Sequence, residues 1–167
     1  RITGTEPVSV LEVSSIPPLN LEQRLSYLLD YPHGCAEQIT SQAFPQLALS
    51  WLLALSPEQQ ITAENNVREV INRLRSYQTP EGGFAYWPGE PYISEWATSY
   101  AVNFLANAQK QGYAVPIQML QNATNYMRQV ANSWNRTEPW SQQDQAYRLY
   151  VLALAGKPDL AAMNRLK

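Results

Sequence analysis

The chain has 167 residues and a net charge of −2, with 45% hydrophobic and 16% charged residues. It is long and apolar enough to bury a core, which excludes a disordered tail. It has no long basic run, and no apolar run near the roughly 20 residues of a membrane-spanning helix, so we expect no nucleic-acid partner and no direct membrane contact.

The first 19 residues are predicted to be an extended arm or linker from a preceding β domain. Valines alternate there with polar residues until Pro17-Pro18 breaks the pattern. Because the chain begins with Arg1 rather than Met, we expect it to be a piece of a longer protein. From residue 20 onward the apolar spacing is helical, and a first helix is predicted to end at Tyr31-Pro32.

Two further helices are predicted before residue 78. One runs over residues 35–55, has apolar positions as far as Trp51, and is expected to kink at Pro45. The next begins after Ser56, because that residue is a good N-cap and Gln59 occupies the capping-box position.

Three more helices follow, each with a start signal. Ser94 and Pro116 begin the fourth and fifth helices, and Gly112 suits the left-handed end of the fourth. Ser141 and Asp144 are predicted to form the capping box of the sixth. Pro158-Asp159 then indicates the start of another helix, after Gly156 ends the sixth.

Helices of about 15 residues joined by short loops predict antiparallel hairpins stacked side by side. The expected fold class is therefore all-α, a partial α/α toroid over residues 20–167 preceded by the arm of residues 1–19. The turn at residues 78–84 has the pattern Gln-x-x-x-Gly-x-aromatic, which is an ordinary helix-to-helix turn by itself. It also resembles the turns of α/α-toroid proteins such as prenyltransferases, terpene cyclases and complement thioester domains.

The sequence has one cysteine, Cys35, and one histidine, His33. An internal disulfide and a Cys/His zinc site are excluded by this count, and we expect no metal and no cofactor. A lone cysteine is most often a buried, inert small hydrophobe. A chemical role for Cys35 therefore depends on the residues around it.

Those residues form a specific motif. Residues 34–38, Gly-Cys-Ala-Glu-Gln, match the Gly-Cys-x-Glu-Gln signature of the alpha-2-macroglobulin and complement thioester family. The chain is also similar to that family in the aromatic-Pro lead-in at Tyr31-Pro32 and in the Ala-Phe-Pro-x-Leu stretch at residues 43–47. The resemblance spans roughly residues 20–155. It implies the N-terminal half of a thioester domain, similar to the bacterial members of the family.

The chemistry of the motif follows from a helix that begins at Cys35. Gln38 then lies one turn on, within reach of the sulfur. A helix N-terminus favours a thiolate, which can attack the Gln38 amide carbon and expel ammonia, while nearby N–H groups stabilise the oxyanion. Gly34 suits the tight entry turn. Glu37 is expected to satisfy N-terminal amides of the helix, and no catalytic residue is assigned.

The resemblance implies how such a bond is used. Neighbouring domains of the parent chain, and aromatic side chains, would bury the thioester until a protease cleaves a bait region. A nucleophile on the protease or target would then take the Gln38 acyl group. Some complement proteins use a downstream histidine in this step. Here that region holds Asp144 and Gln145, so transfer to amines is expected, and His33 is expected to be a packing residue of the entry loop.

Aromatic residues near the motif have two interpretations. Tyr31 is either a shield for the thioester or a core residue at the end of the first helix. A larger set either lines a sugar- or peptide-binding groove or fills the centre and rim of the toroid; its members are Tyr86, Trp87, Tyr92, Trp96 and Trp140.

Three function classes remain open at this stage. The first, implied by the resemblance, is a single-use protease-trapping inhibitor in a bacterial envelope, periplasmic or on the cell surface as a lipoprotein. The second is an α/α-toroid enzyme, prenyltransferase-like or lyase-like. Such an enzyme needs a metal cluster or an aspartate motif, and the acidic residues here are scattered. The third is a helical interaction module whose thioester motif is inactive.

Overall fold

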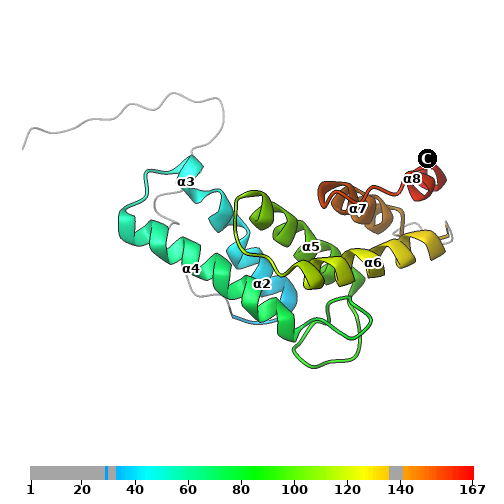
Figure 1. The fold of residues 1–167 in the computed structure, drawn as a ribbon, viewed down its shortest axis with the longest axis horizontal. Coiled ribbons are helices and arrows are strands. Elements are labelled where there is room, and N and C mark those ends of the chain that lie inside the picture. Colours follow the sequence, from blue (N-terminus) through cyan, green and yellow to red (C-terminus); the bar gives the residue numbers. More distant parts are fainter. Residues whose placement is uncertain (1–28, 30–32, 136–140) are drawn as a thin grey trace, which may run out of the picture.

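The computed structural model describes residue 29, residues 33–135 and residues 141–167. The extended pairing recorded among these residues is limited to two isolated bridges, Gln78 with Phe84 and Ala85 with Ile93. In chain order (Figure 1), the helices are α2 Ala36–Ala43, the 3-10 helix η1 Pro45–Leu47, α3 Leu49–Leu52, α4 Pro57–Arg73, the 3-10 helix η2 Leu74–Ser76, α5 Glu95–Lys110, α6 Ile117–Ser133, α7 Ser141–Leu154 and α8 Leu160–Leu166.

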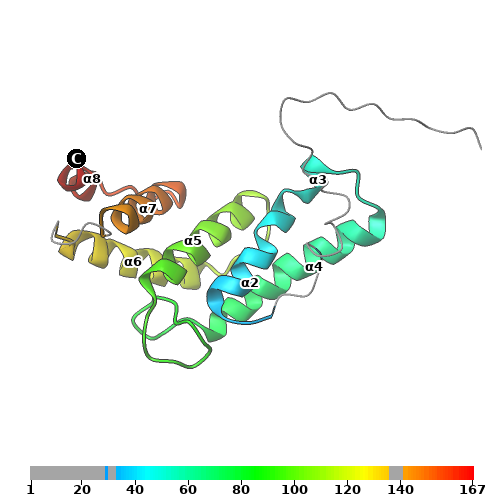
Figure 2. The same ribbon diagram turned by 180° about the vertical axis from the view of Figure 1, so that it is seen from behind.

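The longer helices form two layers. Helices α2, α5 and α7 contact one another in series, while α4, α6 and α8 each pack against a helix of that row. Helices α4 and α6 lie in front of the row in Figure 1 and behind it in Figure 2. Apart from the short α3, successive helices therefore alternate between the layers, as stacked helix hairpins do.

The hydrophobic core lies where the two layers meet. Ile39 of α2, Val70 of α4 and Phe104 of α5 have no exposed surface, and Met127 of α6 is 1% exposed. Burying a side chain of this size contributes roughly 1.5–3 kcal/mol relative to leaving it in water. The loop between η2 and α5 also inserts Phe84, which is fully buried, into the same core.

Most predicted helix starts are confirmed. Ser56 and Gln59 form the reciprocal capping box, with the Ser56 N–H donating to Gln59 Oε1 at 2.9 Å. The hydroxyl of Ser94 accepts the Ala97 N–H at 3.2 Å, which caps α5. Asp159 caps α8 in the same way, so a helix does follow the sixth predicted one. These caps satisfy N–H groups that have no partner inside their helix.

The prediction of one kinked helix over residues 35–55 is wrong. Helix α2 ends at Ala43, and Pro45 begins a separate 3-10 turn, η1. A proline has no N–H to donate and its ring clashes with the preceding turn, so the break is stronger than a kink. Trp51 lies in the separate short helix α3 and is 75% exposed rather than part of the apolar face.

Helix α7 begins at Ser141, close to the predicted start. The residue before it lies outside the described residues, so the capping box of Ser141 with Asp144 stays a prediction. The predicted arm of residues 1–19, and the first predicted helix apart from Leu29, lie outside the described residues. No helix within the described ranges is both long and apolar enough to cross a membrane.

Candidate functional site

Cys35 occupies the N-cap position of α2. Its backbone is extended, with φ −70° and ψ 171°, and the helix begins at the next residue. The residue is 5% exposed. The predicted placement of Cys35 at the start of a helix is therefore confirmed. Cys35 is therefore shielded from bulk water at the position next to the first turn of the helix.

The side chain of Gln38 folds back toward this start. The Cys35 N–H donates a hydrogen bond of 3.1 Å to Gln38 Oε1, as in the reciprocal arrangement of a capping box. The amide also lies directly over Gly34, because a Cβ atom built on that glycine would be 2.0 Å from Gln38 Oε1 and 2.9 Å from Gln38 Cδ. Cys35 and Gln38 are thus brought together, with the amide carbon held on the Gly34 side of the helix start.

Gly34 has two reasons to be glycine. Its φ of +112° lies in a region that L side chains rarely adopt. The space where its side chain would stand is also occupied by the Gln38 amide. The carbonyl oxygen of Gly34 in turn accepts a hydrogen bond of 2.7 Å from the hydroxyl of Tyr77, a residue that is 2% exposed.

Tyr77 begins the segment of residues 77–93, which we call the clamp loop. It runs from η2 to α5 and projects from the lower edge of the molecule in Figure 1. The Gln78 side-chain amide donates to the carbonyl oxygens of Gly82 and Met119, each at 2.9 Å, which fixes the turn on α6. The buried Phe84 N–H donates to Thr98 Oγ1 at 2.8 Å, which fixes it on α5. The clamp loop is therefore held by both neighbouring helices.

The clamp loop contacts the start of α2 at two more points. The Ala36 N–H donates to the Tyr86 carbonyl at 2.9 Å, which satisfies one of the unpaired amides of the helix. The Tyr86 hydroxyl donates a short hydrogen bond to Glu37 Oε2. That bond, with burial and the negative charge of Glu37, raises the pKa of Tyr86 to about 12. The prediction that Glu37 satisfies helix amides is thus replaced by a pairing with Tyr86.

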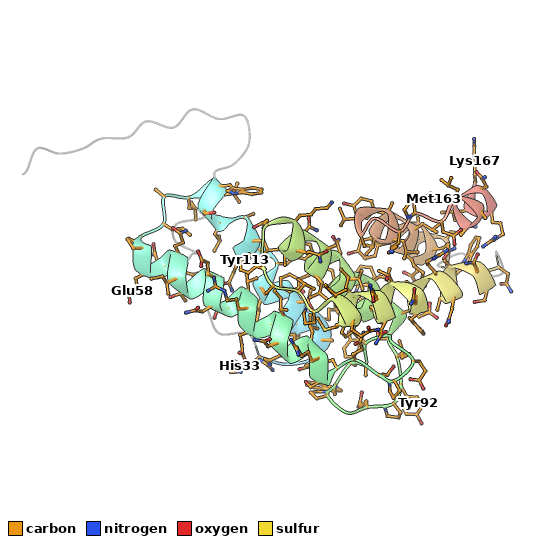
Figure 3. The ribbon with its side chains drawn as sticks, viewed as in Figure 1. His33, Glu58, Tyr92, Tyr113, Met163 and Lys167 are labelled. Carbon is orange, nitrogen blue, oxygen red and sulfur yellow. The ribbon has the colours of Figure 1, made fainter. Side chains whose placement is uncertain are left out.

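The other predicted site residues differ in their placement. His33 lies in the entry loop that leads into α2 (Figure 3), where its N–H donates to Gln42 Oε1 at 2.8 Å. Its place in the entry loop is as expected, but the residue is exposed, which does not bear out the expected packing role. Tyr31 and Trp140 lie outside the described residues.

The remaining aromatic residues do not behave as one set. Tyr92, at the tip of the clamp loop (Figure 3), is 82% exposed, and Trp87 is 49% exposed, so neither fills a core. Trp96 instead joins α5 to α7, because its ring centroid lies 6.1 Å from that of Tyr100 and 5.2 Å from that of Tyr147. Trp96 is itself 45% exposed, so this group packs at the surface between the two helices and not inside the helical layers.

The start of α7, where a histidine acceptor was considered, has a structural arrangement. Gln145 is fully buried, and its amide donates to the Ala131 carbonyl at 3.0 Å. Arg148 is 3% exposed, and its guanidinium lies 2.5 Å from both Glu95 Oε2 and Gln145 Oε1. Burial lowers the pKa of Arg148, while the nearby carboxylates of Glu95 and Asp144 oppose that shift. The described residues contain no group of three or more His, Cys, Asp or Glu side chains that could hold a metal ion.

Sequence reasoning missed the residues that hold the site from a distance. Tyr77 is 43 positions from Gly34, and its bond to that carbonyl depends on the path of the clamp loop. The Gln-x-x-x-Gly-x-aromatic turn was the one available signal, since it begins at the next residue and places the loop against α6. Tyr86 was noted for its aromatic ring, but its partner is the carboxylate of Glu37.

Comparisons with known proteins agree on one family. The family model of the A-macroglobulin TED domain matches residues 9–159. Alpha-2-macroglobulin of Escherichia coli strain K12 is 30% identical over 168 residues, covering 93% of this chain and 10% of that protein. The chain therefore spans about a tenth of that relative's length.

Solved structures give the same result. The crystal structure of Salmonella alpha-2-macroglobulin reacted with methylamine has a TM-score of 0.75 and 30% identity, over 90% of this chain and 11% of that one. The crystal structure of trypsin-activated alpha-2-macroglobulin from Escherichia coli has a TM-score of 0.67 and 27% identity, over 81% and 10% respectively. This likeness confirms the predicted fold class, an all-α domain that is part of an α/α toroid.

Proposed function

This chain belongs to the A-macroglobulin TED (thioester) domain family, and on that premise we propose that Cys35 and Gln38 form an internal thioester. The observation that carries the proposal is the hydrogen bond of 3.1 Å from the Cys35 N–H to Gln38 Oε1. It holds the amide of one residue against the backbone of the other, on the turn where the sulfur also lies.

Bond formation would proceed by acyl transfer within the chain. The Cys35 sulfur adds to the Gln38 amide carbon, and the oxygen that becomes negative is the one already bonded to the Cys35 N–H. The C–N bond then breaks, the thiol proton passes to the leaving nitrogen, and ammonia departs. The product is a thioester that bridges positions 35 and 38.

The thioester would react with an amine. The amine nitrogen adds to the Gln38 acyl carbon, the C–S bond breaks, and the proton of the amine ends on the Cys35 sulfur. No histidine occurs after Cys35 in the sequence to act as an intermediate acyl acceptor. This supports direct transfer to amines such as lysine side chains. The burial of Cys35 would protect the bond from water before activation.

For the whole protein we propose a single-use protease trap in a bacterial envelope, periplasmic or on the cell surface as a lipoprotein. Proteases would cleave the parent chain elsewhere, and the exposed thioester would tether them or other targets covalently. A relative of this chain has been solved in a trypsin-activated form, which supports the choice of trigger. Other domains of the same parent chain would cover the site before cleavage.

A trapping assay on the full-length protein tests this function. Trypsin added to the native protein is expected to appear in a complex that survives denaturing electrophoresis, and Cys35→Ala should abolish that complex. His33→Ala is the matched control, because His33 lies in the entry loop two residues before Cys35 and should leave trapping unchanged. If no covalent complex forms although trypsin cleaves the protein, the trapping function is wrong, and an interaction module with an inactive motif is the better account.

A further inference from the structure

The peptide unit that joins Gly34 to Cys35 is hydrogen bonded at both ends. Its carbonyl oxygen, on Gly34, accepts from the Tyr77 hydroxyl at 2.7 Å. Its N–H, on Cys35, donates to Gln38 Oε1 at 3.1 Å. The three groups form a chain that runs from the Tyr77 hydroxyl, through one peptide plane, to the carbonyl on which a thioester would be built.

We propose that Tyr77 is a positioning residue for the thioester, acting through the Gly34–Cys35 peptide. This inference rests on the proposed function, because it names a further residue that serves the same bond. The Tyr77 hydroxyl fixes the direction of the peptide plane, so that the Cys35 N–H points at the oxygen where negative charge develops.

The geometry of Gly34 explains why the peptide needs such a partner. A glycine at φ +112° is free to adopt several backbone conformations, so little in its own structure selects one orientation of the following peptide. If this plane turned over, the Gly34 carbonyl oxygen would face Gln38 Oε1, and two acceptors would oppose each other. The bond from Tyr77 stabilises the orientation that places a donor there instead.

Tyr77 is itself held firmly enough to set this direction. It is 2% exposed, its N–H donates to the Leu74 carbonyl at 3.1 Å, and its carbonyl accepts the Ala85 N–H at 2.8 Å. Both of its backbone groups are therefore used by η2 and the clamp loop. Side chains locked in this way can hold a reacting group within the narrow limits that acyl transfer requires.

The same hydrogen bond also has an electronic effect. A carbonyl that accepts a hydrogen bond makes the N–H of its own peptide a better donor, because the bonds in such a chain polarise one another. A stronger donor at Cys35 stabilises the oxyanion both when the sulfur attacks and when an amine attacks later. Tyr77 would thus influence formation of the bond and its reaction through one contact.

The experiment compares Tyr77→Phe with wild type in the full-length protein. The change removes the hydroxyl and keeps the ring. The rate at which methylamine releases the Cys35 thiol is expected to fall about fivefold, the effect of losing one hydrogen bond that acts indirectly on the reacting oxygen. The infrared carbonyl stretch of the thioester, isotope-labelled at glutamine, should move to higher wavenumber because its donor is weaker.

Tyr147→Phe is the matched control. It also removes a hydroxyl from a partly buried tyrosine and breaks a bond, here 2.8 Å long, with the Asn103 amide, but it lies on α7. Its methylamine rate and carbonyl stretch should equal those of wild type. Equal rates and equal stretches in Tyr77→Phe and Tyr147→Phe would overturn the proposal, whereas a Tyr77→Phe protein that folds but forms no thioester would support it.

A second variant gives a test of opposite sign if Tyr77→Phe fails to fold. A fluorinated tyrosine at position 77 keeps the ring and its hydroxyl but makes that hydroxyl a stronger donor. It should lower the wavenumber of the carbonyl stretch and speed thiol release, and no change in either would contradict the role of Tyr77. Absence of a thioester from the wild-type protein would instead refute the proposed function, so the two failures are distinguishable.

Discussion

Replacing Gly34 with alanine tests how the Gln38 amide is held. The new Cβ atom would stand 2.0 Å from Gln38 Oε1, so the amide must leave its place over the glycine. An L residue at φ +112° costs on the order of 1–3 kcal/mol, and loss of the bond from the Cys35 N–H costs about 1 kcal/mol more. The combined loss of roughly 2–4 kcal/mol should lower the Tm of this chain by about 4–16 °C.

Gly89→Ala is the control for backbone strain alone. Gly89 also has a positive φ, +77°, but a Cβ atom there meets nothing within 4 Å. Its expected cost is about 1–2 kcal/mol. Thermal unfolding of both variants, and of Gly34→Ala combined with Gln38→Ala, separates the two effects. If Gly34→Ala loses no more than Gly89→Ala, and Gln38→Ala shows no coupling to it, Gln38 does not lie over Gly34 and the reasoning fails.

Three further predictions concern the surroundings of the site. Tyr86 should titrate with a pKa of about 12, and ultraviolet titration of Glu37→Gln should show this pKa return toward 10.0. Because the folded pKa is higher than the unfolded one, the contribution of the Tyr86–Glu37 pair to stability is complete below about pH 10 and is lost by about pH 12, which pH-dependent unfolding can check. Glu95→Gln should lower the free energy of unfolding in urea by roughly 1–2 kcal/mol, because it leaves Arg148, which is 3% exposed, without its carboxylate partner. The 54% exposure of Glu95 keeps this loss below that of a fully buried pair, and a loss near zero would contradict the pairing. Thr98→Val should lower the free energy of unfolding by about 1–3 kcal/mol, because the buried Phe84 N–H loses its acceptor. Thr124→Val removes a hydroxyl that is bonded only within its own helix, so its loss should be less than half as large. Equal losses in the two variants would count against the hydrogen bond that anchors the clamp loop on α5.

The sequence was sufficient where the structure depends on near neighbours. The capping box of Ser56 and Gln59 spans four residues, and the hydroxyl of Ser94 caps a helix that begins one residue later, so both starts could be predicted. The approach of Gln38 to Cys35 followed from one helical turn. The break after Ala43 was underestimated because the apolar spacing continues across Pro45 although the helix does not.

Contacts between distant residues could not be predicted in this way. The Tyr77 hydroxyl reaches Gly34 across 43 positions, and the partner of Arg148 is Glu95, 53 positions earlier. An arginine in a helix is usually solvated, and nothing near Arg148 in the sequence indicates its burial. Glu37 was assigned to the amides of its own helix, which local spacing favours, but the clamp loop brings Tyr86 to the same carboxylate.

The central claim, a thioester between Cys35 and Gln38, is tested most directly by the intact mass of the native full-length protein. The account predicts a mass lower than that of the sequence by one ammonia, with no titratable Cys35 thiol. Methylamine should then add to Gln38 and release one thiol. A native protein with the full sequence mass and a free Cys35 thiol would contradict the claim.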